Sequence, residues 1–198
     1  MDRIGFQATA ILLAGGRSSR MGEDKCLLDI RGKPLITHVL DQLSAQFDEV
    51  IVSASSPDGY PTLDVRVIPD KSADRGPLMG ILSCLEMSMH ELNFVQACDI
   101  PDTDWLLVEE LLHRARQGGD VVMPISGNGR LEPLFAVYNR SAIPGITEVL
   151  NARDGAARAI VKTCDAHIVP RDELSITNLN DMKDYLSYVK KKWPIDRI

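Results

Sequence analysis

The sequence lacks the features that mark several common classes of protein. It has no apolar run near the ~20 residues that a membrane-spanning helix needs. Its formal net charge is -6, and its cations gather in one early loop and near residue 191, so it lacks the basic face of a general nucleic-acid binder. The apolar run from Ala8 to Leu13 is short and leads into Gly15-Gly16-Arg17 rather than a cleavage site. We therefore expect a cytoplasmic protein that binds neither nucleic acid nor membrane.

Patterns for metal chelation by cysteine or histidine, and for covalent catalysis, are also missing. The four cysteines are too widely spaced for a C-x-x-C site and are interpreted as reduced thiols. The four histidines have no partners three or four positions away and no neighbouring cysteine, which argues against a zinc site. No nucleophile elbow and no serine, histidine and acid grouping is recognisable.

Short apolar runs alternate with helical patterns along the chain. The strands are expected at 9–13, 49–53, 65–68, 93–97, 120–124, 134–138 and 167–170, with a short extended run at 26–30. The helices are expected at 34–45, 77–89, from about 102 to 115, and at 141–151, 156–163 and 182–192. This alternation favours an α/β fold, a three-layer, doubly wound, mostly parallel sheet with helices on both faces.

The most informative stretch runs from Leu12 to Lys25. Small residues at Ala14, Gly15 and Gly16 follow an apolar strand and let backbone amides approach a ligand. Arg17, Arg20 and Lys25 add positive charge in the same loop, which suits a triphosphate. The stretch matches neither the P-loop nor the dinucleotide-binding spacing. A glycine-rich turn with solvated cations is the plainer alternative.

This stretch resembles the L-A-G-G-x-x-x-R-M-G-x-D-K signature of the MobA-type nucleotidyltransferases, the molybdenum cofactor guanylyltransferases. The matching residues are Leu13, Ala14, Gly15, Gly16, Arg20, Met21, Gly22, Asp24 and Lys25. The resemblance implies a Rossmann-like nucleotidyltransferase fold. We expect one domain over residues 1–198, with a nucleotide half at about 1–101 and an acceptor half at about 102–198.

Two later segments also resemble motifs of this family. Asp70 followed by Gly76-Pro77-Leu78 and Gly80 is similar to the D-x(n)-G-P-L-x-G element, whose acid contacts the nucleotide, although a proline-initiated helix alone explains the pattern equally well. The segment 98–101 matches C-D-x-P, which implies that Asp99 binds Mg²⁺. A carboxylate at the end of a strand suits that ion, and the alternative is that Asp99 only caps the next helix.

Residues for the acceptor are implied by weaker matches. Arg130 and Pro133 fit the family element R-x-x-P-L-F-A, for which a tight turn with a solvated ion pair is an equal alternative. Asn178 and Asn180 fit the start of N-x-N-T-P-x-D, but the segment 181–182 replaces the Thr-Pro, and asparagines before a helix are also ordinary caps.

Loops that follow predicted strands should meet at one edge of a parallel sheet, where such folds bind nucleotides. The loops at 14–25, 70–76 and 98–101 all satisfy this condition, which predicts one active site. The resemblance implies transfer of GMP from GTP to the terminal phosphate of molybdopterin, with Mg²⁺ as cofactor and pyrophosphate as product. The implied catalytic residues are Arg20, Lys25 and Asp99. The implied nucleotide-binding residues are Leu13, Ala14, Gly15, Gly16, Lys25, Ser53, Asp70 and Asp99.

Two alternatives remain open at this point. Ser53 stands where the family uses an asparagine to read guanine, and one hydroxyl cannot replace both faces of an amide. A CTP-dependent cytidylyltransferase is therefore an alternative, although those relatives usually open with Ala-Ala-Gly. The second alternative is an inactive nucleotide-binding protein that acts as a partner in cofactor insertion, which the departures from the family motifs at Ser53 and at 181–182 motivate. Other proteins of molybdenum cofactor biosynthesis or insertion are a further class of expected partner.

Overall fold

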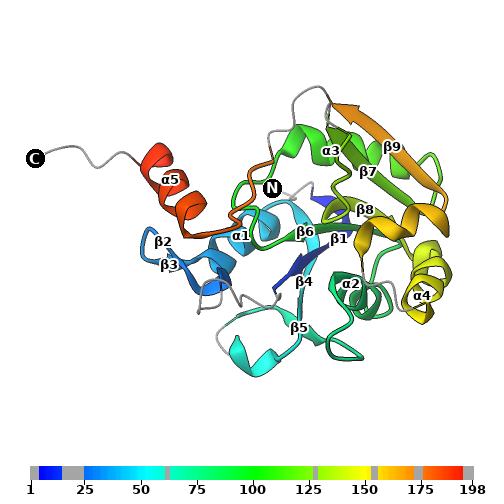
Figure 1. Ribbon diagram of the computed structural model, residues 1–198, viewed down its shortest axis with the longest axis horizontal. Coiled ribbons are helices and arrows are strands. Elements are labelled where there is room, and N and C mark those ends of the chain that lie inside the picture. Colours follow the sequence, from blue (N-terminus) through cyan, green and yellow to red (C-terminus); the bar gives the residue numbers. More distant parts are fainter. Residues whose placement is uncertain are drawn as a thin grey trace, which may run out of the picture.

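A seven-stranded sheet in the order β5-β4-β1-β6-β8-β7-β9 forms the centre of the molecule (Figure 1). The structure, a computed structural model, describes residues 5–14, 25–60, 63–126, 129–152, 156–171 and 176–193. The strands are β1 (Phe6–Leu13), β4 (Phe47–Ala54), β5 (Arg66–Pro69), β6 (Leu92–Ala97), β7 (Val121–Ser126), β8 (Phe135–Asn139) and β9 (Ala166–Arg171). Because β8 alone runs antiparallel to its neighbours, the prediction of a mostly parallel sheet is confirmed.

Helices cover both faces of this sheet. Ala10 and Leu12 of β1 face one apolar cluster, whereas Ile11 and Leu13 face another. The first cluster includes α1 (Leu35–Ser44) and α3 (Trp105–Ala115), and the second includes α2 (Pro77–Leu85) and α4 (Ile143–Asn151). Strands buried on both faces read as continuous apolar runs, which explains why β1 and β4 were recognisable in the sequence.

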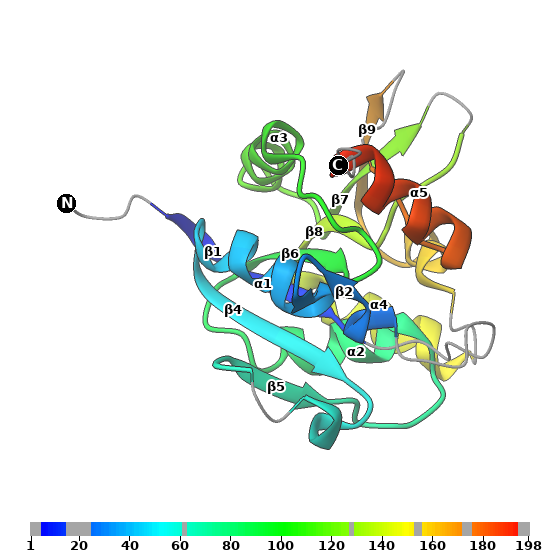
Figure 2. The ribbon, with the colours of Figure 1, turned by 90° about the vertical axis from the view of Figure 1, so that its left-hand side faces the viewer.

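The last helix, α5 (Met182–Lys192), lies beside α1 and the small hairpin of β2 (Asp29–Ile30) and β3 (Lys33–Pro34) (Figures 1 and 2). The hydroxyl of Tyr185 donates to the carbonyl oxygen of Asp29 at 2.5 Å. The hydroxyl of Tyr188 donates to Asp102 Oδ1 at 3.0 Å. These bonds fix α5, and with it the segment 176–180 that precedes it.

The helix expected at 77–89 is wrong at its C-terminal end. It ends at Leu85, where the hydroxyl of Ser88 donates to the Leu85 carbonyl at 3.0 Å. The backbone N–H of Met89 then donates to Glu49 Oε2 at 2.8 Å, and Met89 is 77% exposed. The Ser88 hydroxyl as a donor and the Glu49 carboxylate as an acceptor therefore bind the chain where apolar spacing alone would extend the helix.

Two shorter segments also differ from expectation. The extended run expected at 26–30 starts instead as a 3-10 turn at Lys25–Leu27 and becomes extended only at β2. The turn that follows needs positive φ at Arg31 (56°) and Gly32 (81°). The helix expected at 156–163 is present at Ala157–Lys162, but as a 3-10 helix. Among the described residues, no helix is both long and apolar enough to cross a bilayer.

Candidate functional site

The carboxyl ends of β4, β1 and β6 lie side by side. The backbone N–H of Ala14 donates to the carbonyl of Ser53 at 2.8 Å, and that of Cys98 donates to the carbonyl of Leu13 at 3.0 Å. Hydrogen bonds thus tie together the first residues beyond these strands. The predicted meeting of loops at one sheet edge is confirmed for the described parts of those loops.

A cavity of about 520 Å³ opens at the ends of β1, β4 and β5. This volume falls in the range of small-molecule sites, which is about 300–1,000 Å³. Of the residues predicted to bind nucleotide, Leu13, Ala14, Ser53 and Asp70 line it. Other lining residues were not predicted, among them Ser55, Ser56, Tyr60, Asp74, Arg75 and Gly80.

Ser53 and Asp70 form the polar floor of this cavity. The Ser53 hydroxyl donates to Asp70 Oδ1 at 3.3 Å. Burial raises the pKa of the Asp70 carboxyl, and the bond from Ser53 opposes that shift. A Cβ on Gly80 of α2 would lie 2.2 Å from Ser53 Oγ and 3.2 Å from Asp70 Oδ1. Only glycine therefore lets the helix approach this pair so closely.

The loop between Asp70 and Gly76 is held by its neighbours. The backbone N–H of Lys71 donates to the Ser83 hydroxyl at 3.1 Å, and the guanidinium of Arg75 donates to the carbonyl of Leu150. The loop has φ values of 59° at Asp74 and 72° at Gly76. Aspartate and glycine tolerate this left-handed region better than bulky or β-branched residues, so the sequence suits the turn. The cavity wall is thus pre-formed by α2 and α4.

Asp99 lies one strand away from the cavity, after β6. Its backbone carbonyl accepts a hydrogen bond from the N–H of Leu179 at 2.8 Å. Burial raises the pKa of the Asp99 carboxyl, while the positive charges of Lys25 and Arg130 pull it back down. Residues that are far apart in sequence therefore supply the cations that face this carboxylate.

Lys25 connects the first loop with the segment before α5. Its Nζ donates to the carbonyl of Leu179 at 3.1 Å and to the carbonyl of Asn180. The side-chain amide of Asn180 donates to the carbonyl of Asn178 at 3.3 Å. The structure therefore brings two of the predicted acceptor residues to the neighbourhood of Lys25 and Asp99.

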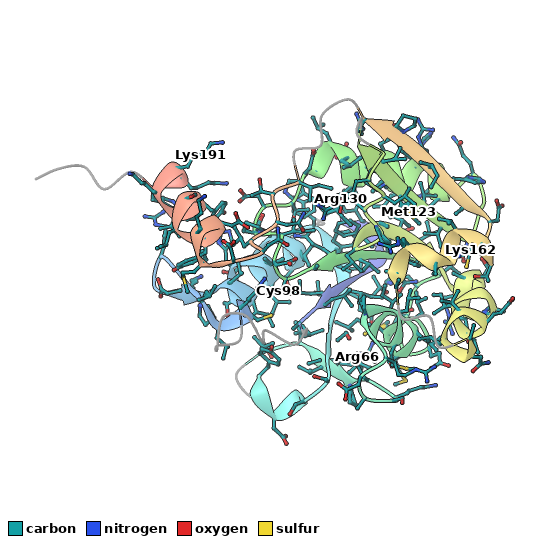
Figure 3. All side chains as sticks on the ribbon, in the orientation of Figure 1. Arg66, Cys98, Met123, Arg130, Lys162 and Lys191 are labelled. Carbon is teal, nitrogen blue, oxygen red and sulfur yellow. The ribbon has the colours of Figure 1, made fainter. Side chains whose placement is uncertain are left out.

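The turn before β8 contributes a further charged pair near Asp99 and Lys25. Arg130 Nε lies 2.8 Å from Glu132 Oε1, and the Glu132 side chain is only 12% exposed. The alternative of a solvated ion pair is therefore wrong for the carboxylate. The carbonyl of Pro133 accepts from the Tyr138 hydroxyl at 2.8 Å, and that of Leu134 accepts from the N–H of Ala97 at 2.9 Å. These bonds anchor the turn against the end of β6. Figure 3 shows Arg130 and Cys98 in the central part of the view, between α5 and β9.

The observed helix caps show whether Asp99, Asn178 and Asn180 are only caps, which was the alternative to a role in the site. Asp104 caps α3, because its side chain accepts from the N–H of Leu107 at 3.1 Å. Asp181 caps α5 in the same way, accepting from the N–H of Asp184 at 2.9 Å. Asp99 is therefore not the cap of α3, and the alternative that Asn178 and Asn180 cap α5 is wrong.

Asp99 was also predicted to bind Mg²⁺. Over the described residues, no three histidine, cysteine or acidic side chains gather as a ready cation cage. Mg²⁺ usually binds to only one or two carboxylates together with substrate phosphates and water. A single half-buried carboxylate at a strand end fits that kind of site.

Gly15, Gly16, Arg17 and Arg20 lie outside the described residues, so their predicted roles are not tested.

Comparison with known proteins gives consistent matches. A family profile described as "MobA-like NTP transferase domain" matches residues 10–169. A "Probable molybdenum cofactor guanylyltransferase" of Pelotomaculum thermopropionicum is 40% identical over 74% of this chain and 71% of its own length. A "Molybdenum cofactor guanylyltransferase" of Pseudomonas putida is 34% identical over 68% of this chain and 71% of its own.

Solved structures share the fold. Molybdopterin-guanine dinucleotide biosynthesis protein A from Archaeoglobus fulgidus superimposes with a TM-score of 0.80 at 21% identity, over 93% of this chain and 97% of that one. 2-C-methyl-D-erythritol 4-phosphate cytidylyltransferase from Thermus thermophilus gives 0.67 at 16% identity, over 92% and 97%. At these identities the likeness concerns the fold alone, which matches the predicted nucleotidyltransferase architecture.

Proposed function

Because this chain belongs to the MobA-like NTP transferase family, we propose that it transfers GMP from GTP to the terminal phosphate of molybdopterin. The products are molybdopterin guanine dinucleotide and pyrophosphate. One observation carries the proposal: the cavity floored by Ser53 and Asp70 opens at the same sheet edge as Asp99 and Lys25, one strand away. A nucleotide whose base occupies the cavity can extend its phosphates toward that carboxylate and that cation.

The polar floor of the cavity supports guanine as the base. A carboxylate accepts hydrogen bonds with both oxygens, and guanine presents adjacent N–H donors at N1 and N2. Cytosine and adenine instead present one amino group beside an acceptor nitrogen, which would leave a carboxylate oxygen facing a lone pair. Ser53 bonds to Oδ1 of Asp70 and so orients the carboxylate. The missing asparagine therefore does not deprive the cavity of a guanine-reading group.

The reaction needs little covalent help from the protein. A phosphate monoester has a second pKa of about 6, so the acceptor is largely dianionic at pH 7 and needs no general base. The main obstacle is repulsion between anions. Asp99 would hold Mg²⁺, which when bound would supply positive charge to offset the phosphate oxygens. Lys25 and Arg20 offset charge on the departing pyrophosphate, and the amides of Gly15 and Gly16 position it.

The acceptor half of the single domain, at about 102–198, supplies the second substrate site. We assign the acceptor to Arg130, Pro133, Asn178 and Asn180. The first two lie in the turn anchored against β6, and the last two lie in the segment bonded to Asp99 and Lys25. None of these four residues lines the base cavity, which leaves that cavity to the nucleotide.

The direct test is product formation from purified protein, molybdopterin and GTP or CTP, with EDTA and then with Mg²⁺ restored. We expect a guanine dinucleotide and pyrophosphate from GTP only when Mg²⁺ is present. A cytosine dinucleotide from CTP instead would assign the chain to the cytidylyl relatives. Thermal stabilisation by GTP without any product would identify an inactive nucleotide-binding protein.

A further inference from the structure

A largely buried carboxylate beside the acceptor segment has no part in the mechanism above. Glu132 has backbone bonds on both sides: its N–H donates to the carbonyl of Pro124 at 3.1 Å, and its carbonyl accepts from the N–H of Phe135 at 3.1 Å. The preceding residue, Leu131, forms a bridge with Ile125 of β7. The backbone of Glu132 is therefore fixed in place between β7 and β8.

The side chain of Glu132 is fixed to Arg130. Its Oε1 lies 2.8 Å from Arg130 Nε, so the two side chains form a close ion pair. The two side chains differ in exposure, at 12% for Glu132 and 61% for Arg130. The buried partner thus acts as the anchor and the exposed guanidinium as the group that can meet a ligand. Because the guanidinium is planar and rigid, an ion pair at Nε restricts the positions that its other N–H groups can take.

The fixed guanidinium lies near the reacting centre. The charge of Arg130 lowers the pKa of Asp99, and the charge of Asp99 raises that of Glu132, on which burial has the largest effect. The carbonyl of Leu134, in the same turn as Arg130, accepts from the N–H of Ala97, two residues before Asp99, so this turn lies beside the end of β6. A phosphate monoester that approaches Asp99 from the acceptor side meets Arg130, whose forked N–H groups match phosphate oxygens.

We propose that Glu132 is a positioning residue, which holds the Arg130 guanidinium in the orientation that receives the phosphate monoester of the acceptor. Glu132 itself contacts no substrate. Its buried, fixed carboxylate spares Arg130 the loss of side-chain entropy that an unanchored arginine would incur on binding. This inference rests on the proposed function for the identity of the acceptor, but the phosphate subsite is testable without it.

The first test uses inorganic phosphate and NMR of the arginine Nε–Hε signals in the full chain. The Arg130 signal is assigned by its loss in Arg130→Lys. In the wild type we expect it to exchange slowly with solvent and to shift as phosphate is added. Glu132→Gln, which keeps the shape of the side chain, should speed the exchange and weaken phosphate binding about tenfold. An Arg130 signal unaffected by Glu132→Gln would overturn the inference, whether or not the protein transfers GMP.

The second test separates positioning from general structure by kinetics. Glu132→Gln should raise KM for the acceptor about tenfold and leave KM for GTP within about twofold. In an Arg130→Gln background the same change should add less than about twofold, because the residue acts through Arg130. Glu110→Gln is the matched control, since Glu110 pairs with Arg114 and Arg171 away from the site.

Other outcomes contradict the inference in distinct ways. An equal rise in KM in both backgrounds would mean that Glu132 does not act through Arg130. A loss of turnover with a higher Mg²⁺ requirement would mean that Glu132 touches the metal. If Glu132→Gln failed to fold, Arg130→Lys would replace it in the test. Lysine keeps the positive charge but lacks the forked N–H groups of arginine, so this variant should raise KM for the acceptor to a similar extent.

Discussion

Two regions lie at one edge of the sheet: the cavity at the ends of β1, β4 and β5, and the charged group of Asp99, Lys25 and Arg130 after β6. They depend on different kinds of residue. The cavity floor depends on small residues: Gly80 allows α2 to approach Ser53, and Ser53 in turn orients Asp70. The charged group depends on opposite charges, with Asp99 facing the cations Lys25 and Arg130. The difference teaches that shape and fixed acceptors suit a base, whereas compensated charges suit phosphates.

Both regions contain a carboxyl whose pKa is raised by burial, yet they offset burial differently. Asp70 receives a neutral hydrogen bond from Ser53, which is a near neighbour across the β4–β5 pair. Asp99 faces cations from the first loop and from the turn before β8. Changes in the charged group should therefore affect turnover most, and changes in the cavity should mainly affect the affinity for GTP.

The largest expected effect is that of Asp99→Asn. Turnover should fall by about a hundredfold or more, because the variant lacks the carboxylate proposed to bind Mg²⁺. The melting temperature at pH 7 should rise, since a neutral amide replaces a carboxylate whose ionised form burial disfavours. Asp41→Asn, which removes only an exposed pair with Lys33, should change neither quantity by much. Turnover within about tenfold of the wild type would contradict the role of Asp99.

Lys25→Ala should also lower turnover by about a hundredfold, because a charge facing the leaving pyrophosphate is lost. Unlike Asp99→Asn, this variant should be less stable, since the bonds from Nζ to the carbonyls of Leu179 and Asn180 disappear. Steady-state kinetics and thermal denaturation measure the two effects. Lys33→Ala is the matched control for loss of a lysine. Full activity of Lys25→Ala would place the catalytic charge elsewhere.

Gly80→Ala should act on the cavity alone. The new Cβ would meet Ser53 Oγ at 2.2 Å, so the floor must shift and KM for GTP should rise about tenfold, with a smaller change in kcat. Gly145→Ala in α4 controls for a clash as such, because its Cβ would meet Cys164 Sγ at 2.5 Å outside the cavity. The control should lower stability without changing KM. Equal KM values for GTP in Gly80→Ala and Gly145→Ala would contradict the assignment of the cavity to GTP.

The smallest expected effect is on the pH dependence of stability. Burial raises the pKa of Asp70 above its ordinary value of 3.8, so the folded state binds this proton more tightly than the unfolded state. The favourable contribution of the proton is present at low pH and is lost as the pH rises through the folded pKa. Asp70→Asn should therefore raise the melting temperature by a few degrees at pH 7, on a scale of about 2–4 °C per kcal/mol.

This gain should disappear when the pH falls below the ordinary value of 3.8, where aspartic acid and asparagine are both neutral. Thermal denaturation of the wild type and of Asp70→Asn between pH 3 and pH 8 measures the difference. A gain of the same size at both ends of that range would mean that packing, and not ionisation, distinguishes the two residues.

The sequence predicted what local patterns determine. Asp70 and Asp99 could be placed because each comes shortly after a predicted strand, and parallel strands end at one edge. The end of α2 could not be predicted, because Met89 continues the apolar spacing while the stop comes from Glu49, distant in sequence. The role of Glu132 was missed because a glutamate two residues after an arginine is typical of an exposed turn. Only the packing of β7 against β8 buries the Glu132 side chain.

The contact between Lys25 and the carbonyl of Asn180 was also beyond sequence reasoning. It depends on α5 crossing back to α1 and the β2–β3 hairpin, where Tyr185 bonds to Asp29. No local sequence pattern predicts that α5 packs against elements from the start of the chain. The motif match at Asn178 and Asn180 suggested a shared site, and the fold supplies the physical reason for it.

The most direct test of the central claim is a crystal structure of the protein with α,β-methylene-GTP and Mg²⁺. The account predicts guanine in the cavity with its N1 and N2 edge at Asp70, and the α-phosphate near Asp99 on the side that faces Arg130. A base bound outside the cavity, or phosphates directed away from Asp99, would contradict the division of this sheet edge into a base site and a charged reaction site.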